Sequence, residues 1–174
     1  HEWTEEEKKE EKAVAAEIDT IITWNRHYEQ FLFHPGDLPF SRSQIPEVFG
    51  AFRKRCEKEV QVQPLILTSP SLPISNSIGV KDNVPNLYDL GLAPIKKDQR
   101  SAFPFLGGTV AGMKRLEQYF WKSKKLSFYK NTRNGLLGPD YSSKFSPWLA
   151  NGCLSPKTIY WDIKRYEKEI QKNQ

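Results

Sequence analysis

Three serines and one lysine lie close together in residues 137–155, immediately before a helix-start signal. Ser142, Ser143 and Lys144 lead into Ser146 and Pro147. A serine at a helix start accepts hydrogen bonds from orphan amides, and proline in the first turn loses no hydrogen bond. Free N–H groups, the positive end of a helix dipole, hydroxyls and an ammonium together suit an anion the size of phosphate. The same residues also fit a plain capped helix after a turn, so both interpretations stay open.

Upstream of this segment, basic and aromatic residues alternate. Lysines and an arginine flank Phe128 and Tyr129, an arrangement that suits single-stranded nucleic acid through charge and stacking. The alternative, which we favour, is a solvated helix face with its rings turned inward. The basic residues are Lys122, Lys124, Lys125, Lys130 and Arg133.

Neither the cysteines nor the histidines have the spacing of a metal site. Cys56 and Cys153 are 97 positions apart without a second cysteine or histidine nearby. We therefore expect each cysteine to pack as a small apolar group, and no zinc site. His1, His27 and His34 are isolated, and no catalytic residue is expected.

The composition describes a small chain with few aliphatic core residues and many rings. The 174 residues fit one domain, or one domain with an arm. Hydrophobic residues make up 38%, mean hydropathy is −0.64 and aromatic residues make up 13%. We expect a core built from rings, some of which need a partner surface. No apolar run approaches the roughly 20 residues of a membrane span.

Charge is unevenly distributed along the chain. Residues 1–30 hold nine acidic and four basic residues, whereas residues 31–174 hold twelve acidic and twenty-two basic ones. The basic C-terminal part is compatible with a polyanion partner and equally with a solvated lysine face.

Periodicity and capping signals predict a mainly α-helical chain whose helices are joined by long irregular linkers. No strand is expected, and residues 61–100, rich in Pro, Ser, Asn and Gly, are expected to be a linker. The expected helices are 4–24, 46–60, 85–90, 109–121 (after Gly107-Gly108), 124–130, 146–151 and one that starts at 156.

One long run of residues resembles a known family. The segment Tyr129–Lys157 closely resembles the photolyase/cryptochrome superfamily. Within it, the motif Asp-Tyr-Ser-Ser-Lys-Phe-Ser-Pro-Trp-Leu-Ala is similar to the DASH-type cryptochromes. Weaker similarity covers Gly107-Gly108, Pro46–Arg55 and His34–Phe40. One departure is Thr109, where the family pattern Gly-Gly-Glu has an acid.

The resemblance implies an all-helical domain that holds FAD, uses blue light and serves DNA repair or signalling. It implies a contact set for the diphosphate and ribose of FAD: Tyr129, Ser142, Ser143, Lys144, Phe145 and Ser146. It also implies three regions: 1–45 as a helix and connector from the tail of an α/β domain, 46–100 as a helix and inter-domain linker, and 101–174 as the first helices of a partial FAD-binding domain.

The resemblance covers only the linker and the opening helices of the flavin domain. We expect the antenna folate site to be absent, together with the helices that enclose the flavin and carry the electron-transfer tryptophans. The tryptophans present are expected to be packing residues, and photocatalysis by this chain alone is not expected. They are Trp3, Trp24, Trp121, Trp148 and Trp161.

Two functions are therefore expected. The first is a portion of a DASH-type flavoprotein, a blue-light photoreceptor or light-dependent DNA repair protein, that supplies the wall contacting the FAD diphosphate. The alternative is a truncated, flavin-free scaffold or assembly subunit. Expected partners are the remainder of the flavoprotein or other subunits, and single-stranded DNA through Lys130 and Arg133. We expect an intracellular location, in an organelle such as the chloroplast or in the cytoplasm, rather than secretion.

Overall fold

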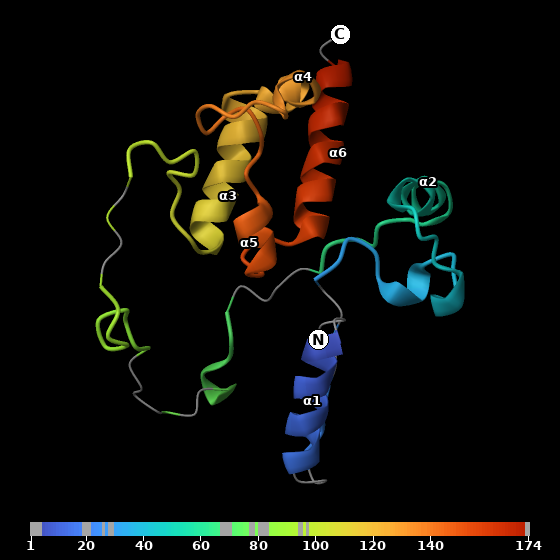
Figure 1. The fold of residues 1–174 in the computed structure, drawn as a ribbon, viewed down its shortest axis with the longest axis vertical. Helices are drawn as coiled ribbons and strands as arrows, with labels where there is room; N and C mark the ends of the chain where they lie inside the picture. The colour runs from blue at the N-terminus through green and yellow to red at the C-terminus, as the bar shows by residue number, and fades with distance from the viewer. Residues whose placement is uncertain are drawn as a thin grey trace.

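The structure is a computed structural model, and within the residues it describes the chain is helical without a strand (Figure 1). This agrees with the mainly α fold class expected from the sequence. The described residues are 5–18, 22–25, 27, 30–66, 71–76, 79, 84–93, 96 and 98–172.

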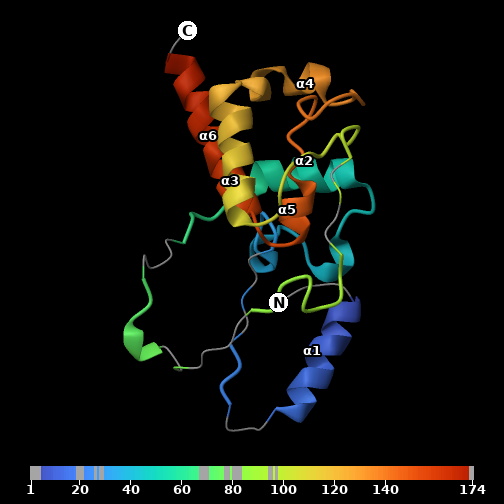
Figure 2. The same cartoon turned by 90° about the vertical axis from the view of Figure 1, so that its left-hand side faces the viewer.

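Six α-helices are connected by short 3₁₀ turns and extended segments in the described part of the chain. Their bounds are α1 Glu5–Glu17, α2 Phe49–Glu59, α3 Thr109–Glu117, α4 Tyr129–Thr132, α5 Ser146–Ala150 and α6 Pro156–Lys172. Helix α3 continues into a π turn, Gln118–Lys122, and a 3₁₀ turn, Lys125–Phe128, precedes α4. In both views α3 and α6 lie side by side, and α1 stands apart from them (Figures 1 and 2).

The core lies where α3, α5 and α6 meet, and most of it is aromatic. Trp148 of α5 is buried against Phe103 and Phe105, at ring-centroid distances of 5.2 and 5.6 Å. Its indole N–H donates to the carbonyl oxygen of Leu106 at 3.2 Å. Rings bury large areas and their pairwise contacts add stability, so a chain poor in aliphatic residues still forms a core here. The other buried core members are Leu116, Tyr119, Phe120, Phe145, Leu154 and Tyr166.

A glycine lets α3 approach the chain between α5 and α6. A Cβ at Gly112 would lie 2.9 Å from Cγ of Leu154, closer than packed side chains allow. Gly112 is therefore required by packing at this point.

The first helix is shorter than the sequence suggests. It ends at Glu17, and residues 22–25 are not helical, so the expected extension to 24 is wrong. The residues that follow Glu17 are rich in β-branched isoleucine and threonine, which favour helix weakly. The helix also buries no residue, so core packing does not compensate. Thr4, the first residue of the expected helix, lies outside the described residues.

Two further expectations in the first hundred residues need correction. Helix α2 begins at Phe49 rather than 46. The expected helix 85–90 is not formed either. Residues 87–91 form turns, which are closed by a hydrogen bond from Leu92 N to Leu87 O at 2.8 Å. The Asn86 side chain accepts from the amides of the next turn, and Gly91 has a φ of 72°, which ends it.

The two thiols differ in accessibility, and this gives a first testable prediction. Cys56 lies on the buried side of α2, and its burial raises the pKa of the thiol, whereas Cys153 is partly exposed. Because the thiolate is the reactive form and must be reached by the reagent, Cys56 should react with iodoacetamide at least about tenfold more slowly than Cys153. Peptide mass spectrometry over time measures both rates, and equal rates would show that the Cys56 thiol is not protected from solvent. Both should react alike in denaturant.

Candidate functional site

The predicted FAD-contacting residues cluster in one loop. Residues 139–145, called the 139–145 loop below, connect the irregular segment after α4 to the start of α5 and pass beside α3 (Figures 1 and 2). Ser142, Ser143 and Lys144 are all partly exposed in it. The loop is not helical, so the direction of its backbone groups depends on what holds it.

A buried arginine on α3 holds the loop. The side chain of Arg115 is only 3% exposed. Its Nε donates to the carbonyl oxygen of Ser143 at 3.1 Å, and its Nη2 donates to the carbonyls of Pro139 at 3.0 Å and Ser142 at 3.1 Å. Its Nη1 pairs with Oδ1 of Asp140 at 2.7 Å. One side chain thus fixes the loop at four points.

Two aromatic rings cover the guanidinium. Its central carbon lies 4.5 Å from the ring centroid of Phe105 and 4.8 Å from that of Tyr119. Cation–π contacts of this kind offset part of the cost of burying a charge. Burial raises the pKa of Tyr119, although the charge of Arg115 acts in the opposite direction, so this ring stays neutral beside the cation.

The arginine contacts determine where the loop amides point. The described residues contain no cis peptide bond. In a planar trans peptide the C=O and the following N–H point in opposite directions. Since the carbonyls of Ser142 and Ser143 face Arg115, the N–H groups of Ser143 and Lys144 face away from it. Neither amide donates a hydrogen bond to the part of the chain that the structure describes.

The backbone at the end of the loop changes hand between two residues. Lys144 has a φ of 62°, in the left-handed region, and Phe145 follows with φ −76° and ψ −16°. Successive residues of opposite hand turn their N–H groups into one concavity, a nest that binds anions. A non-glycine residue with positive φ costs about 1–2 kcal/mol, and such strain is concentrated at functional sites.

The Lys144 ammonium is held at the loop surface by one neighbour. Its Nζ donates to the hydroxyl of Tyr141 and lies 3.5 Å from the centroid of that ring. The ion pairs of the described residues include no carboxylate at this ammonium, so Lys144 can pair with a bound anion.

The expected capping role of Ser146 is wrong. The residue before it, Phe145, already has helical dihedral angles, so Ser146 lies inside the first turn of α5 and its hydroxyl forms no capping bond. With five residues, α5 also contributes little dipole. The positive character of the site therefore comes from the loop amides and Lys144. Ser146 itself is exposed.

The two aromatic members of the predicted contact set have different environments. Phe145 is buried in the core, 5.7 Å from the ring of Phe120, so only its backbone is available to a ligand. Tyr129 begins α4 and is 37% exposed. The described contacts include no hydrogen bond between Tyr129 and the 139–145 loop.

The basic residues considered for nucleic-acid contact lie on the surface near α4. Lys130 in α4 and Arg133 at its end are both exposed. The rings beside them are exposed as well, Phe128 to 57%. The expectation that these rings turn inward is therefore wrong: in the 3₁₀ turn Lys125–Phe128, it is Leu126 and not Phe128 that packs against the core.

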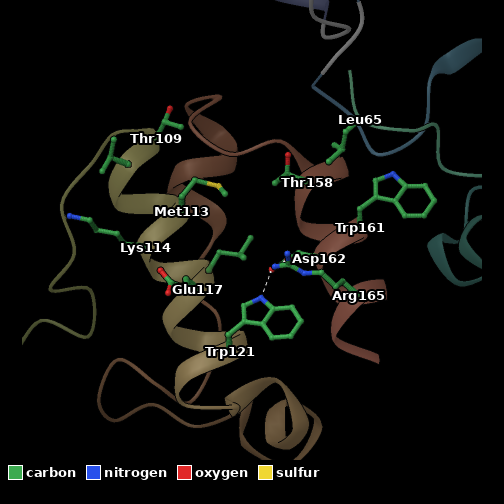
Figure 3. A pocket seen from close by; sticks show the side chains of 12 residues that line it. Leu65, Thr109, Met113, Lys114, Glu117, Trp121, Thr158, Trp161, Asp162 and Arg165 are labelled. Carbon is green, nitrogen blue, oxygen red and sulfur yellow. Dashed lines mark hydrogen bonds and ion pairs between the residues drawn. The ribbon is translucent and has the colours of Figure 1, made fainter. Parts of the chain in front are cut away.

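A separate groove opens between α3 and α6 (Figure 3). It has a volume of about 690 Å³ and contains none of the predicted FAD contacts. The indole N–H of Trp121 donates to Asp162 Oδ2 at 3.0 Å, and Arg165 pairs with Asp162 at 2.5 Å while covering the Trp121 ring. Trp161, at the groove edge, donates to the Gln63 carbonyl at 2.9 Å. Hydrogen-bonded side chains of this kind pack the two helices.

No metal-ligand cluster of His, Cys, Asp or Glu occurs among the described residues. The same part of the chain contains no helix that is long and apolar enough to cross a membrane.

Arg115 and Asp140 are the site residues that the sequence analysis missed. Gly112, Leu116, Tyr119 and Phe120 are buried on one face of α3 and its continuation, and Arg115 lies on that same face. A charge at a core-facing helical position requires a partner, because an unpaired buried charge is costly. That spacing was a usable signal for Arg115, whereas nothing local pointed to Asp140.

Comparison with known proteins gives consistent matches. No family model matches the chain. The chain is 45% identical over 142 residues to cryptochrome DASH of Gloeobacter violaceus, covering 82% of this chain and 28% of that protein. It is 47% identical over 143 residues to a rice protein named cryptochrome DASH, chloroplastic/mitochondrial, covering 79% of this chain and 24% of that one.

The fold gives the same result. A solved structure of a Synechocystis cryptochrome superposes with a TM-score of 0.67 at 43% sequence identity, covering 82% of this chain and 29% of the other. The chain thus has the helical fold of part of a photolyase/cryptochrome protein. Within that class it belongs with cryptochrome DASH, and it corresponds to a portion of such a protein. It spans 24% to 36% of the length of the curated relatives it matches.

Proposed function

We propose that this chain supplies the wall that contacts the FAD diphosphate in a DASH-type flavoprotein, a blue-light photoreceptor or light-dependent DNA repair protein. The observation that carries the proposal is the pair of unbonded amides, Ser143 and Lys144, beside the Lys144 ammonium. Two amide donors and one cation match the charge and acceptor oxygens of a diphosphate.

Each residue of the proposed site has a distinct task. Lys144 neutralises phosphate charge, and the amides of Ser143 and Lys144 donate to its oxygens. The hydroxyls of Ser142, Ser143 and Ser146 and the phenol of Tyr129 add further donors, since all four are at least partly exposed. FAD, when bound, supplies light absorption and electron transfer.

The wall is one side of a pocket. Tight binding of a large cofactor requires burial of most of its surface, which a single loop does not provide. We therefore propose that the partner of this chain is the remainder of the flavoprotein, with residues 101–174 as the first helices of the FAD-binding domain, residues 46–100 as the linker and residues 1–45 as the connector.

Competition binding tests the proposal. The full-length protein is titrated with FAD while flavin fluorescence is followed, and inorganic pyrophosphate is then added. We expect FAD to bind, pyrophosphate to displace it, and riboflavin, which lacks phosphate, to bind more weakly. Failure to bind FAD, or binding that pyrophosphate does not affect, would contradict the proposal.

A flavin-free assembly subunit is the second candidate function. It is favoured by large apolar side chains exposed on several elements, among them Phe49 on α2, Val110 on α3 and Leu137. Exposed apolar patches mark partner surfaces. The mass from light scattering and the visible absorption of the native protein separate the two functions. A colourless protein in a stable complex supports the assembly subunit, and a protein with flavin absorption supports the flavoprotein.

Contact with single-stranded DNA is a further proposal for the surface around α4. The exposed rings of Phe128 and Tyr129 lie in sequence beside Lys130 and Arg133. Stacking on such rings combined with phosphate neutralisation is sequence-tolerant and weakens as salt increases. Affinity for an oligothymidine that does not change between low and physiological salt would exclude it.

We also propose an intracellular location, in an organelle or the cytoplasm. The rice and Arabidopsis relatives are named chloroplastic/mitochondrial, and others come from bacteria and animals. Immunodetection in cell fractions would decide it.

A further inference from the structure

We propose that Arg115 is a positioning residue that directs the amides of the 139–145 loop toward the FAD diphosphate. The inference rests on the proposed function and deepens it: α3, which contributes no predicted ligand contact, sets the geometry of the binding loop.

The bonding pattern of Arg115 carries the inference. Three of its four described partners on the loop are backbone carbonyls, those of Pro139, Ser142 and Ser143, and only Asp140 supplies a charge. Asp140 is 48% exposed, so solvent weakens this ion pair. The guanidinium is therefore placed to fix peptide planes rather than to satisfy a buried acid.

The planar fork of arginine is needed for this task. A guanidinium presents five N–H donors in a rigid geometry, so Nε and Nη2 reach the successive carbonyls of Ser143 and Ser142 together. A lysine at the same position keeps the charge and most of the stem but offers one compact centre. It cannot hold two peptide planes and a third carbonyl in fixed directions.

Fixing the carbonyls fixes the amides. With the Ser142 and Ser143 carbonyls on Arg115, the Ser143 and Lys144 N–H groups are held on the opposite side without cost at the moment of binding. Without the fork, these peptide planes can rotate and Lys144 can leave its positive φ, which is the less favourable backbone state. The loss should therefore fall on ligands with phosphate.

The test compares ligands with and without phosphate. Arg115→Lys is made in the full-length protein, with Arg165→Lys as the matched control, because Arg165 is an exposed arginine on α6 with its own ion pair and ring contact. Affinities for FAD, inorganic pyrophosphate and riboflavin are measured, together with the thermal midpoint.

We expect Arg115→Lys to weaken FAD and pyrophosphate by roughly 10- to 100-fold, the loss of one or two charge-assisted hydrogen bonds. Riboflavin affinity should not change, and Arg165→Lys should leave all three affinities unchanged. A merely structural role would weaken FAD and riboflavin in the same proportion, and that result would overturn the inference.

A second variant keeps the test decisive if Arg115→Lys does not fold. Asp140→Ala removes the ion pair between Arg115 and the loop at a half-exposed position. We expect a selective loss of pyrophosphate affinity of about threefold to tenfold. If the unmodified protein binds FAD with pyrophosphate competition but neither variant alters pyrophosphate affinity, the role of Arg115 is refuted. If the unmodified protein binds neither ligand, the proposed function itself fails.

Discussion

Replacing Lys144 with glutamate is expected to lower FAD affinity by about 100-fold or more. The change removes a charge-assisted bond to phosphate and adds a like charge beside it, and each effect contributes about 1.5–3 kcal/mol. The residue also carries one of the two donor amides and follows the other, so the new carboxylate would compete for them. Fluorescence titration with FAD measures the effect.

Lys168→Glu is the matched control for this prediction. Lys168 is exposed on α6 and the substitution makes the same change in net charge. We expect it to alter FAD affinity only slightly, through long-range attraction that salt screens. Equal losses in the two variants would mean that the total charge of the chain, and not the position of Lys144, governs binding.

The second large effect concerns stability. Trp148→Ala should reduce the free energy of unfolding by about 3–5 kcal/mol, because the side chain is 2% exposed and its removal leaves a cavity beside Phe103 and Phe105. It also leaves the Leu106 carbonyl without its indole donor. Urea unfolding followed by circular dichroism measures the loss.

Trp161→Ala is the comparison for the stability prediction. This ring is 37% exposed and its hydrogen bond goes to the backbone of Gln63 at the groove edge. A loss of about 1 kcal/mol is expected, the usual net value of one hydrogen bond. If Trp161→Ala proves the more destabilising of the two, the core is not centred on α5.

Much of the helical pattern could be predicted from local signals. The second Ser-Pro pair behaves as expected: α6 begins at Pro156, and the amide of Lys157 donates to the Ser155 hydroxyl at 3.2 Å. The apolar residues of α6 recur at helical spacing, and Tyr166, which is one of them, is buried in the core. In both cases the signal in the sequence spans only one or two helical turns.

The first Ser-Pro pair shows where local reasoning fails. Ser146 has the same neighbour as Ser155 but lies inside its helix, because Phe145 is drawn into the core by ring contacts with Tyr119 and Phe120. Those partners are more than 20 positions away in the sequence. Long-range packing, and not the local sequence, therefore decides whether a helix begins at the serine or one residue later.

The geometry of the site depends on contacts of the same long range. The residue types of Ser142, Ser143 and Lys144 suggested an anion site, but the direction of their amides follows from Arg115, which is 27 to 28 positions away from the two carbonyls it binds. No local pattern contains that information. The helical spacing that places Arg115 among apolar residues was the one sequence feature that pointed to a tertiary partner.

The central claim is that the Ser143 and Lys144 amides donate hydrogen bonds to a diphosphate. Nuclear magnetic resonance of the protein labelled with ¹⁵N at serine and lysine tests it most directly, with FAD and riboflavin added in parallel. We expect these two amide signals to move downfield with FAD, to saturate together with the fluorescence change, and to stay in place with riboflavin. Flavin binding that leaves both signals where they were would contradict it.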